Sequence, residues 1–338
     1  MSSSTTLLAQ VRTLVTVDVD SMDPDVAARH SAVDKFCDMT SNQAIVHGQA
    51  ARTERSELLK AAVEYVRGQT KAELGATFEQ DVVDVLTVLL AKEVYPHLTG
   101  NVHAQTSPSA AYDTQKTIKH ARKLVALFAA HGIPLTRVCI KIPATPESLV
   151  ACRELQAGGI QTLATCLFSV PQAVAASQAS CTYVAPYFNE LRVHFQAGLW
   201  KDYGDKTSTE HPMSPVIFSI VQAFRALGSK TLVMPASIVT AAEVIALVSL
   251  SPNHLTLSGD VLDALAALPA IAPESFVAPS LSTSPSVEGD YLANGGAMLR
   301  DALAADSEVQ RKLADALAIF GEKEVETREL VRAFVGRM

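Results

Sequence analysis

Short runs of β-branched and apolar residues recur along the chain, and segments with helical periodicity separate them. Between residues 58 and 66, and again between 118 and 128, apolar side chains repeat at the spacing of one helix face. Eight apolar runs predict strands, at residues 14–19, 36–40, 101–105, 137–142, 162–167, 182–187, 231–234 and 255–258. Strand and helix therefore alternate, which is typical of an α/β fold with a parallel sheet.

Eight strands, nearly every one followed by a helix, are the number that closes a (β/α)8 TIM barrel, and a single doubly wound sheet is the competing arrangement. Gly132, the pair Gly158 and Gly159, and Gly228 each precede a strand, where a helix C-cap favours a left-handed residue. We expect one domain over residues 1–338, with the barrel at about 10–285. Residues from about 287 to 338 predict helix without a strand, and this extension packs outside the barrel or against a partner subunit, which leaves a homodimer open.

Composition narrows the class of partner. The 338 residues are 48% hydrophobic and 19% charged, with a formal charge of −7 and no basic block, which disfavours a nucleic-acid or anionic-membrane partner. The apolar runs are too short to span a bilayer, and residues 1–6 show no secretory signal. The five cysteines form no CxxC and predict reduced packing residues in a cytoplasmic protein. A small-molecule substrate remains the expected ligand.

Common cofactor and metal motifs are absent from the sequence. The nine histidines form no HxH or HExxH pattern, and there is no GxGxxG, GxxxxGK[ST] or GxSxG. We therefore expect no metal, and the zinc, dinucleotide, P-loop and serine-hydrolase classes are disfavoured.

A lysine stands inside the fourth predicted strand. The alternation of residues 138–143 (VCIKIP) places Val138, Ile140 and Ile142 on one face and Lys141 on the other, which in a barrel is the lumen. Burial disfavours an ammonium group and lowers the lysine pKa, so the neutral amine can form a Schiff base with a carbonyl substrate. A lysine that snorkels to solvent or pairs with a carboxylate fits the spacing equally well.

Two carboxylates share one face of the first predicted strand. Asp18 and Asp20 alternate with Val17 and Val19, and Asp20 lies nearer the carboxyl end, where barrel enzymes carry their chemistry. Asp20 is therefore the candidate proton carrier, and Asp18 is next in line.

Several segments resemble motifs of the transaldolase family, and the resemblance covers most of the chain. Residues 137–145 (RVCIKIPAT) resemble the strand of the family's Schiff-base lysine, R-[IV]-x-[IV]-K-[ILV] followed by a small residue and threonine. Residues 20–23 (DSMD) resemble the D-T-G-D turn of the catalytic aspartate, residues 40–43 (TSNQ) resemble T-T-N-P, and residues 231–237 (TLVMPAS) resemble V-V-M-G-A-S.

The resemblance implies roles for individual residues. Lys141 would form the imine without any bound cofactor, and Asp20 would act as acid and base at the carbon–carbon bond. Asn42 would hold a substrate hydroxyl, and Ser237 falls in a substrate-binding segment.

Three further positions resemble the fructose-6-phosphate aldolase branch of the family. The classical enzymes have a glutamate where this chain has Gln105 and a phenylalanine where it has Tyr187, and Thr165 is common to both. Gln105 and Thr165 would orient a water to which Tyr187 donates a hydrogen bond. The long C-terminal tail nevertheless resembles the classical length class.

The phosphate-binding positions of the family are altered. Arginines normally follow the sixth and seventh strands and grip a phosphate bidentately. Here the aligned residues are Glu190 and Val239, with Arg192 two positions along and Lys201 in the following loop. Glu190 repels a dianion but can accept hydrogen bonds from a hydroxyl or an amine, which indicates a ketose or hydroxyketone substrate without a phosphate.

Three hypotheses follow for the function. The first is a Schiff-base aldolase or aldol transferase that does not require a phosphorylated substrate, in a biosynthetic side pathway. The second is an ordinary sugar-phosphate transaldolase of the pentose phosphate pathway whose phosphate is held by other residues. The third is an inactive barrel that acts as a binding or scaffold protein. His103 predicts a packing residue, and residues 196–214 predict either a lid or a solvated loop.

Overall fold

The computed structural model describes residues 6–32, 34–69, 76–277, 280–281 and 288–338. Its strands are β1 (Thr16–Val19), β2 (Val102–Gln105), β3 (Val138–Pro143), β4 (Gln161–Leu167), β5 (Tyr183–Pro186), β6 (Leu232–Val233) and β7 (His254–Leu257). Its α-helices are α1 (Leu7–Leu14), α2 (Pro24–His30), α3 (Gln43–Ala50), α4 (Ser56–Gln69), α5 (Ala76–Val94), α6 (Thr114–Ala130), α7 (Pro146–Ala157), α8 (Val170–Gln178), α9 (Thr207–Glu210), α10 (Met213–Leu227), α11 (Ala241–Ser249), α12 (Gly259–Ala267), α13 (Ala293–Ala304) and α14 (Ser307–Val335).

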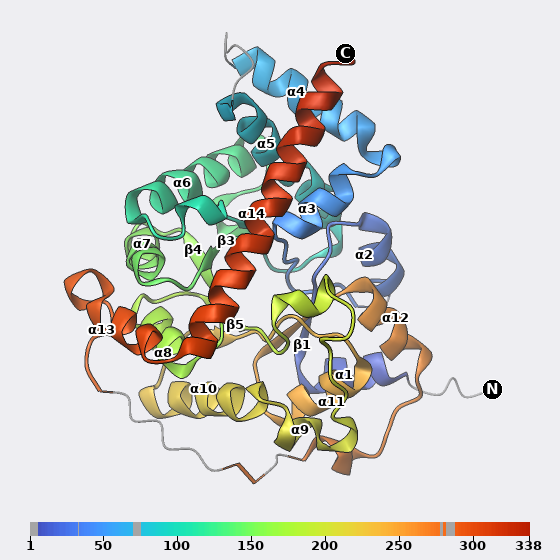
Figure 1. Cartoon of the computed structure of the whole chain (residues 1–338). Helices are drawn as coiled ribbons and strands as arrows, with labels where there is room; N and C mark the ends of the chain where they lie inside the picture. The colour runs from blue at the N-terminus through green and yellow to red at the C-terminus, as the bar shows by residue number, and fades with distance from the viewer. Residues whose placement is uncertain (1–5, 33, 70–75, 278–279, 282–287) are drawn as a thin grey trace.

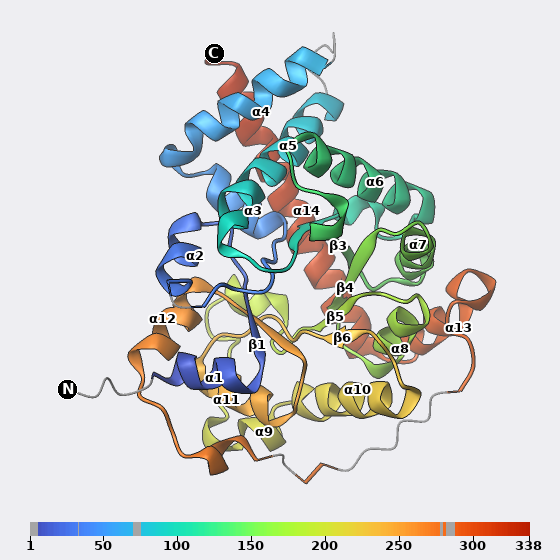
Figure 2. The same ribbon diagram turned by 180° about the vertical axis from the view of Figure 1, so that it is seen from behind.

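All the strands run parallel and helices surround them (Figures 1 and 2). One ladder joins β1 to β7, and a second has the order β2-β3-β4-β5-β6. Met39 bridges the two by pairing with Val19 on one side and Val102 on the other. At the opposite seam, the Asn253 N–H donates to the Val233 carbonyl at 3.0 Å. Backbone hydrogen bonds therefore link the two ladders at both seams, and the predicted α/β fold is confirmed.

The second predicted strand, residues 36–40, forms only isolated bridges. Phe36 pairs with Leu98, and Met39 pairs on both sides. Between them the Asp38 carboxylate takes the Asn101 N–H at 2.7 Å, which removes a donor from the ladder. A side chain thus replaces the backbone pairing that the apolar pattern predicts.

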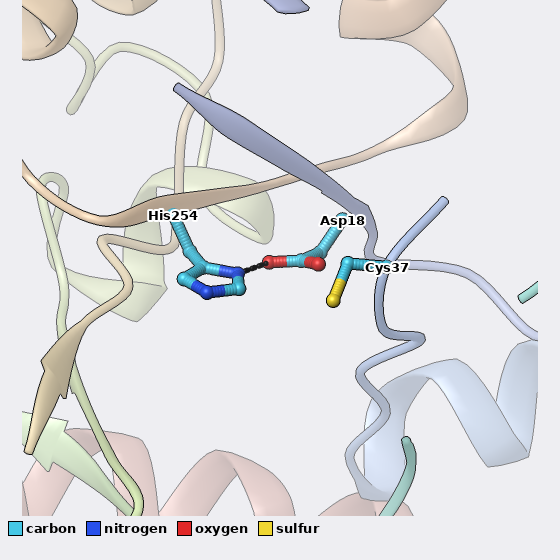
Figure 3. Close-up of side chains that lie close together, drawn as sticks. All are labelled: Asp18, Cys37 and His254. Atoms are coloured by element: carbon cyan, nitrogen blue, oxygen red, sulfur yellow. Dashed lines mark hydrogen bonds and ion pairs between the residues drawn. The ribbon is translucent and has the colours of Figure 1, made fainter. Parts of the chain in front are cut away.

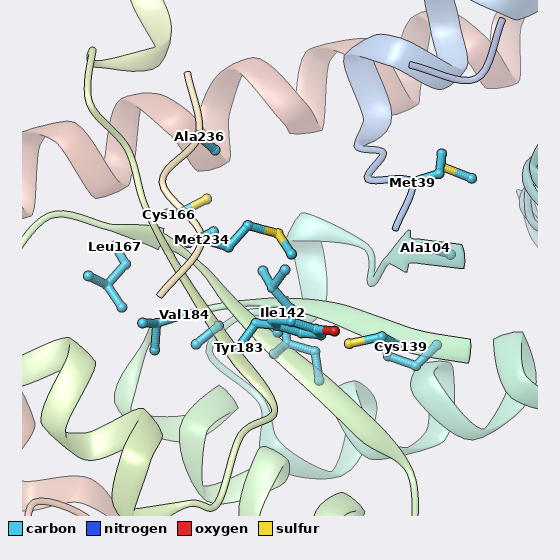
Figure 4. Packing of buried hydrophobic residues seen from close by; sticks show 14 of the residues in the cluster. Met39, Ala104, Cys139, Ile142, Cys166, Leu167, Tyr183, Val184, Met234 and Ala236 are labelled. Atoms are coloured by element: carbon cyan, nitrogen blue, oxygen red, sulfur yellow. The ribbon is translucent and has the colours of Figure 1, made fainter. Parts of the chain in front are cut away.

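Buried apolar side chains from several strands pack together inside the ring of helices, as Figure 4 shows. Val138, Ile140 and Ile142 are wholly buried, as expected for a strand covered by helices. The five cysteines are all free, and four of them are buried. Of the glycines predicted to end helices, Gly228 has φ of 59° and caps α10, and Gly132 and Gly159 also have positive φ.

The long C-terminal helix α14 crosses the carboxyl-end side of the strands (Figure 1). It packs against α3, α5, the end of β4, and the two short 3-10 helices that follow β2 and β5, η3 (Pro108–Ala110) and η5 (Leu191–His194). In the tail, α13 and α14 form the helical part, and residues 288–292 precede α13 without helical structure. Residue 287, where the predicted extension starts, lies outside the described residues. The placement of α14 over the strand ends puts it beside any site formed there.

Gly296 fixes the position of α13, the helix that leads into α14. Its φ is +82°, and a Cβ there would lie 2.8 Å from the Cβ of Pro146 at the start of α7. Gly296→Ala should lower the free energy of unfolding by about 1–3 kcal/mol, because it combines backbone strain with a steric clash. Gly321→Ala is the matched control: a Cβ meets nothing within 4 Å there. Helix propensity predicts a gain of about 1 kcal/mol for it. Urea unfolding measures both, and a G296A protein as stable as wild type would contradict this packing.

Candidate active site

A pocket of about 400 Å³ lies at the carboxyl ends of the strands. This is the end at which parallel barrels carry their active sites. Its polar lining includes Asp20, Asn42, Lys141, Tyr187, His194 and Ser237. The structure therefore brings together five of the residues singled out in the sequence, which come from segments far apart along the chain.

Lys141 is 1% exposed and lines this pocket. Desolvation by burial lowers the pKa of its amine, and the charge of Asp20 opposes the shift without cancelling it. The ring centroid of Tyr187 lies 6.0 Å from Nζ. A lysine in these surroundings carries a larger share of neutral, nucleophilic amine than an exposed lysine does.

A chain of hydroxyls holds the Asp20 carboxylate. The Thr40 hydroxyl donates to Oδ1 of Asp20 at 2.6 Å, and it also contacts the Thr256 hydroxyl at 2.5 Å. The backbone N–H of Asp20 donates to the Leu257 carbonyl at 2.8 Å, which anchors this turn to β7. Asp20 is thus fixed at the wall of the pocket, close enough for its charge to act on Lys141.

Gln105 lies opposite Lys141 in the register of β2 and β3. Its side-chain N–H donates to Oε1 of Gln43 at 2.7 Å, and Gln43 in turn donates to the Thr106 carbonyl at 3.0 Å. Oε1 of Gln105 is buried and has no hydrogen-bond partner among the described residues. Gln43 thus holds Gln105 in place, a role that its position in a helix start did not reveal.

Thr165 and Tyr187 are in contact, as their proposed shared role requires. The Thr165 hydroxyl donates to the Tyr187 oxygen at 3.1 Å. Burial raises the pKa of Tyr187 well above its usual value, so the phenol stays protonated and can donate a hydrogen bond. The register of β4 against β5 shifts between Ala164 and Leu167, and Cys166 there has φ of 52°. Such irregularities re-aim side chains next to active sites.

Asn42 and Ser237 lie on the pocket wall in constrained conformations. Asn42 is the N-cap of α3, and its Oδ1 accepts from the N–H groups of Ala44 and Ile45. That cap leaves the amide NH2 group of Asn42 for a ligand. Ser237 has φ of 59°, and its hydroxyl contacts Nε2 of His194 at 2.8 Å.

Glu190 and Arg192 are not among the residues that line this pocket. Glu190 pairs with Arg192 at 2.9 Å and with Arg311 of α14 at 2.6 Å, and Arg192 also pairs with Asp315 at 3.2 Å. These partners hold the pKa of Glu190 below its usual value despite partial burial. Glu190 and Arg192 therefore join α14 to the segment after β5, and neither charge is part of the pocket lining.

Part of the pocket lining is apolar. Its apolar lining includes Ile45, Leu191, Phe195, Ile238 and Val239. Among the described lining residues there is no arginine, and the basic side chains are Lys141 and His194. Burial lowers the pKa of His194, although Asp20 and Glu243 oppose the shift, so its imidazole is neutral at pH 7. Lys201 is likewise outside the lining, and Trp200 in the same loop donates to Glu243 at 2.9 Å.

A separate polar cluster lies deeper, toward the amino ends of the strands. Asp18, Cys37 and His254 place their ligand-type atoms within 4.8 Å of one another (Figure 3). Both Asp18 oxygens already accept hydrogen bonds, from the Asp38 N–H and from Nδ1 of His254, each at 2.8 Å. Burial and nearby carboxylates raise the pKa of Cys37 to about 12, so the thiol stays protonated. These bonds compete with metal binding, and the cluster is a buried hydrogen-bond network.

The predicted packing histidine, His103, is wholly buried in this network. Its Nε2 lies 2.7 Å from Oδ2 of Asp38. Burial acts to raise the pKa of Asp38, but hydrogen bonds from His103 and Asn101 hold it well below its usual value. His103 therefore stabilises the buried Asp38 carboxylate by a hydrogen bond besides filling space.

The buried Asp18 makes stability depend on pH. Desolvation raises its pKa to about 6, against the opposing hydrogen bond and charge of His254. An unfolded aspartate titrates near ~3.9, so only the folded protein holds this proton between about pH 4 and 6. The protonated Asp18 therefore makes its full contribution to the free energy of unfolding below about pH 4. This contribution is lost as the pH rises through about 6.

Asp18→Asn removes this titration and nearly preserves the side-chain shape. The free energy of unfolding of wild type minus that of D18N should fall as the pH rises from about 4 to about 6. Urea unfolding at a series of pH values measures it, with Asp301→Asn at an exposed helix position as the matched substitution control. A difference that does not vary with pH would contradict the assignment.

The sequence is similar to those of known transaldolases. Residues 16–325 match the Transaldolase/Fructose-6-phosphate aldolase family. A transaldolase of Xanthomonas oryzae pv. oryzae (strain PXO99A) is 29% identical over 95% of each chain. A transaldolase of Aliivibrio salmonicida (strain LFI1238) is 30% identical over 77% of this chain and 79% of its own. An IMP dehydrogenase/GMP reductase-like protein of Corynebacterium glutamicum superposes with a TM-score of 0.43 at 12% identity, covering 86% of this chain and 80% of its own.

The chain is a class I, aldolase-type α/β-barrel enzyme. It belongs to the transaldolase/fructose-6-phosphate aldolase family, whose fold is a TIM barrel. The resemblance read from the sequence motifs is thereby confirmed, as are the fold class and the expectation of an enzyme. In the part of the chain that the structure describes, no helix is both long and apolar enough to cross a membrane.

Proposed function

We propose that this enzyme cleaves or transfers aldol units of an unphosphorylated ketose or hydroxyketone through an imine on Lys141. The observation that carries the proposal is the pocket itself. It contains a desolvated lysine beside a fixed aspartate, and its remaining described basic side chain is a neutral histidine. This set of groups can form an imine but offers no cation dedicated to a phosphate.

The reaction uses groups already positioned at the pocket wall. The neutral Lys141 amine attacks the ketone carbon, and the resulting carbinolamine loses water to give an imine. Asp20 then takes the proton from the β-hydroxyl as the carbon–carbon bond breaks, and the bond electrons move into an enamine. Protonation of the enamine and hydrolysis of the imine release the second product. If an aldehyde accepts the enamine instead, the outcome is transfer.

Tyr187 and Thr165 support direct cleavage or addition alongside transfer. The protonated Tyr187 and the amide of Gln105 can orient a water for imine hydrolysis, because each retains hydrogen-bonding capacity beyond its protein partners. Hydrolysis of the donor intermediate without an acceptor yields a free product.

The apolar part of the lining supports the absence of a phosphate. Val239, which stands where the resemblance places an arginine, lines the pocket, and its apolar side chain has no group that can bind a dianion. Beyond the pocket lining, Glu190 and Asp315 together balance the charges of Arg192 and Arg311. Asp260 is a second carboxylate on the wall, and it disfavours an anion there.

Lys141→Met should abolish covalent trapping of dihydroxyacetone by borohydride, because the replacement removes the amine and keeps the bulk. Intact mass followed by peptide mapping measures the adduct. The exposed Lys92→Met is the control and should trap like wild type. Asp20→Asn should still trap while turnover falls on the order of 10²–10⁴-fold. An adduct that maps to a different lysine would refute the assignment of Lys141.

Val239→Arg should shift preference toward phosphorylated substrates. A charge-assisted hydrogen bond is worth ~1.5–3 kcal/mol, so kcat/KM for fructose 6-phosphate relative to fructose should rise by roughly 10- to 100-fold. Val277→Arg, at a 68% exposed position outside the pocket, is the control and should leave the ratio unchanged. A wild-type ratio in the thousands would instead identify a sugar-phosphate transaldolase whose phosphate is held by other groups.

A further inference from the structure

A second, small space lies behind Gln105. It has room of about 20 Å³, enough for a single water. Gln43, Gln105, His120 and Glu324 line it, and Asn42 lines both this space and the Lys141 pocket. Asn42, at the start of α3, therefore forms part of the wall of both spaces. The proposed Schiff-base chemistry gives no role to the water-sized space or to Glu324.

The hydrogen bonds around Gln105 show which of its side-chain atoms is left without a partner. Gln43 donates its side-chain N–H to the Thr106 carbonyl, so its Oε1 must face Gln105. Gln105 must then donate to Gln43 through its own nitrogen, which leaves Oε1 as the free acceptor. This buried atom has no partner among the described residues and needs a donor such as water.

Glu324 brings a buried carboxyl group from the middle of α14 to the same space. The Ser107 hydroxyl donates to its Oε1 at 2.9 Å, and Ser107 N–H donates to Nδ1 of His120. Desolvation raises the pKa of Glu324. The titratable side chains that face it are His120, Arg328 and Asp84; the Ser107 hydrogen bond and Arg328 oppose the shift, and Asp84 reinforces it. A protonated carboxyl group is therefore available at a higher pH than an exposed glutamate allows.

The same carboxyl group also faces a larger cavity. Glu324, His120 and Asp84 line a space of about 900 Å³ between α5, α6 and α14. Glu324 thus lines both a water-sized space, which shares Asn42 with the Lys141 pocket, and a cavity large enough to hold many waters. A proton lost on one side can be replaced from the other.

We propose that Glu324 is a positioning residue that delivers a proton, through one water held on Oε1 of Gln105, to the imine-forming site. The proposal rests on the Schiff-base function of Lys141. In this proposal a carboxyl group on the C-terminal helix exchanges the proton, which Gln105 cannot do because its side chain is an amide.

The proton balance of the step is simple. The carbinolamine hydroxyl takes a proton from the water and leaves as a second water, while the nitrogen lone pair forms the C=N bond of the iminium ion. The first water regains its proton from the Glu324 carboxyl group, which becomes a carboxylate. Hydrolysis of the imine runs the same transfers in reverse and returns the proton to Glu324.

Exchange of carbonyl oxygen isolates this step from carbon–carbon cleavage. Dihydroxyacetone in ¹⁸O-labelled water takes up label each time its imine forms and is hydrolysed, beyond the uncatalysed rate. Glu324→Gln should slow this exchange on the order of 10²-fold, the lower range for acid–base catalysis, and leave the final extent of borohydride trapping unchanged. The control is Glu326→Gln, two residues beyond Glu324 on the same helix, where the carboxylate pairs with Lys323. This variant should exchange like wild type.

The outcomes separate the relay from the underlying function. If E324Q exchanges at the wild-type rate, the relay is wrong while the imine on Lys141 stands. If wild type shows neither exchange nor trapping, the Schiff-base function itself fails, and the relay fails with it. If E324Q does not fold, Glu324→Asp is measured instead. It keeps the carboxyl group on a side chain that is one methylene shorter, so the acid lies farther from the water-sized space. Slower exchange by E324D supports the relay, and an unchanged rate overturns it.

Discussion

Burial of the Lys141 amine is the constraint on which the rest of the site depends. An ammonium group at a 1% exposed position pays a desolvation cost that the neutral amine avoids, and the structure supplies only the partial compensation of the Asp20 charge. Asp20 is itself held by Thr40 and by the backbone of β7. The carboxylate is therefore held where its charge acts on the amine, and burial gives that amine a larger neutral share than an exposed lysine has.

The C-terminal helix α14 completes the carboxyl end of the strands. Its Arg311 pairs with Glu190 after β5, and farther along the helix its Glu324 bonds Ser107 after β2. The helix α14 thus contacts both the segment after β5 and the segment after β2 through polar side chains. Glu190 and Arg192, at and near a position that resembles a phosphate site, are engaged in this contact, and among the described residues that line the pocket there is no arginine.

Sequence patterns predicted the parts of the molecule that depend on local periodicity. The alternation around Lys141 and the apolar runs of seven strands reflect which side chains a pleated strand buries. The failure at residues 36–40 has a specific cause, because the Asp38 side chain takes the N–H of Asn101, 63 residues away. Glu190 is a similar case: its partner Arg311 lies 121 residues along the chain, and no local signal connects them.

The residues around Gln105 show the same limit. Gln43 looks like an ordinary helix start in the sequence, and only the fold reveals that its amide orients Gln105. Glu324 lies on a tail whose periodicity predicts helix but not its crossing of the strand ends. His194, Thr256 and Asp260 likewise line the pocket without a motif to mark them.

The most direct test of the account is the titration of the Lys141 amine itself. In protein labelled with ¹³C-lysine, the Cε resonance that disappears in K141M belongs to Lys141, and its chemical shift can be followed with pH by NMR. Burial predicts a midpoint below the ~10.4 of exposed lysines. A midpoint that coincides with those of the exposed lysines would show that the amine stays charged at neutral pH, and it would contradict the account.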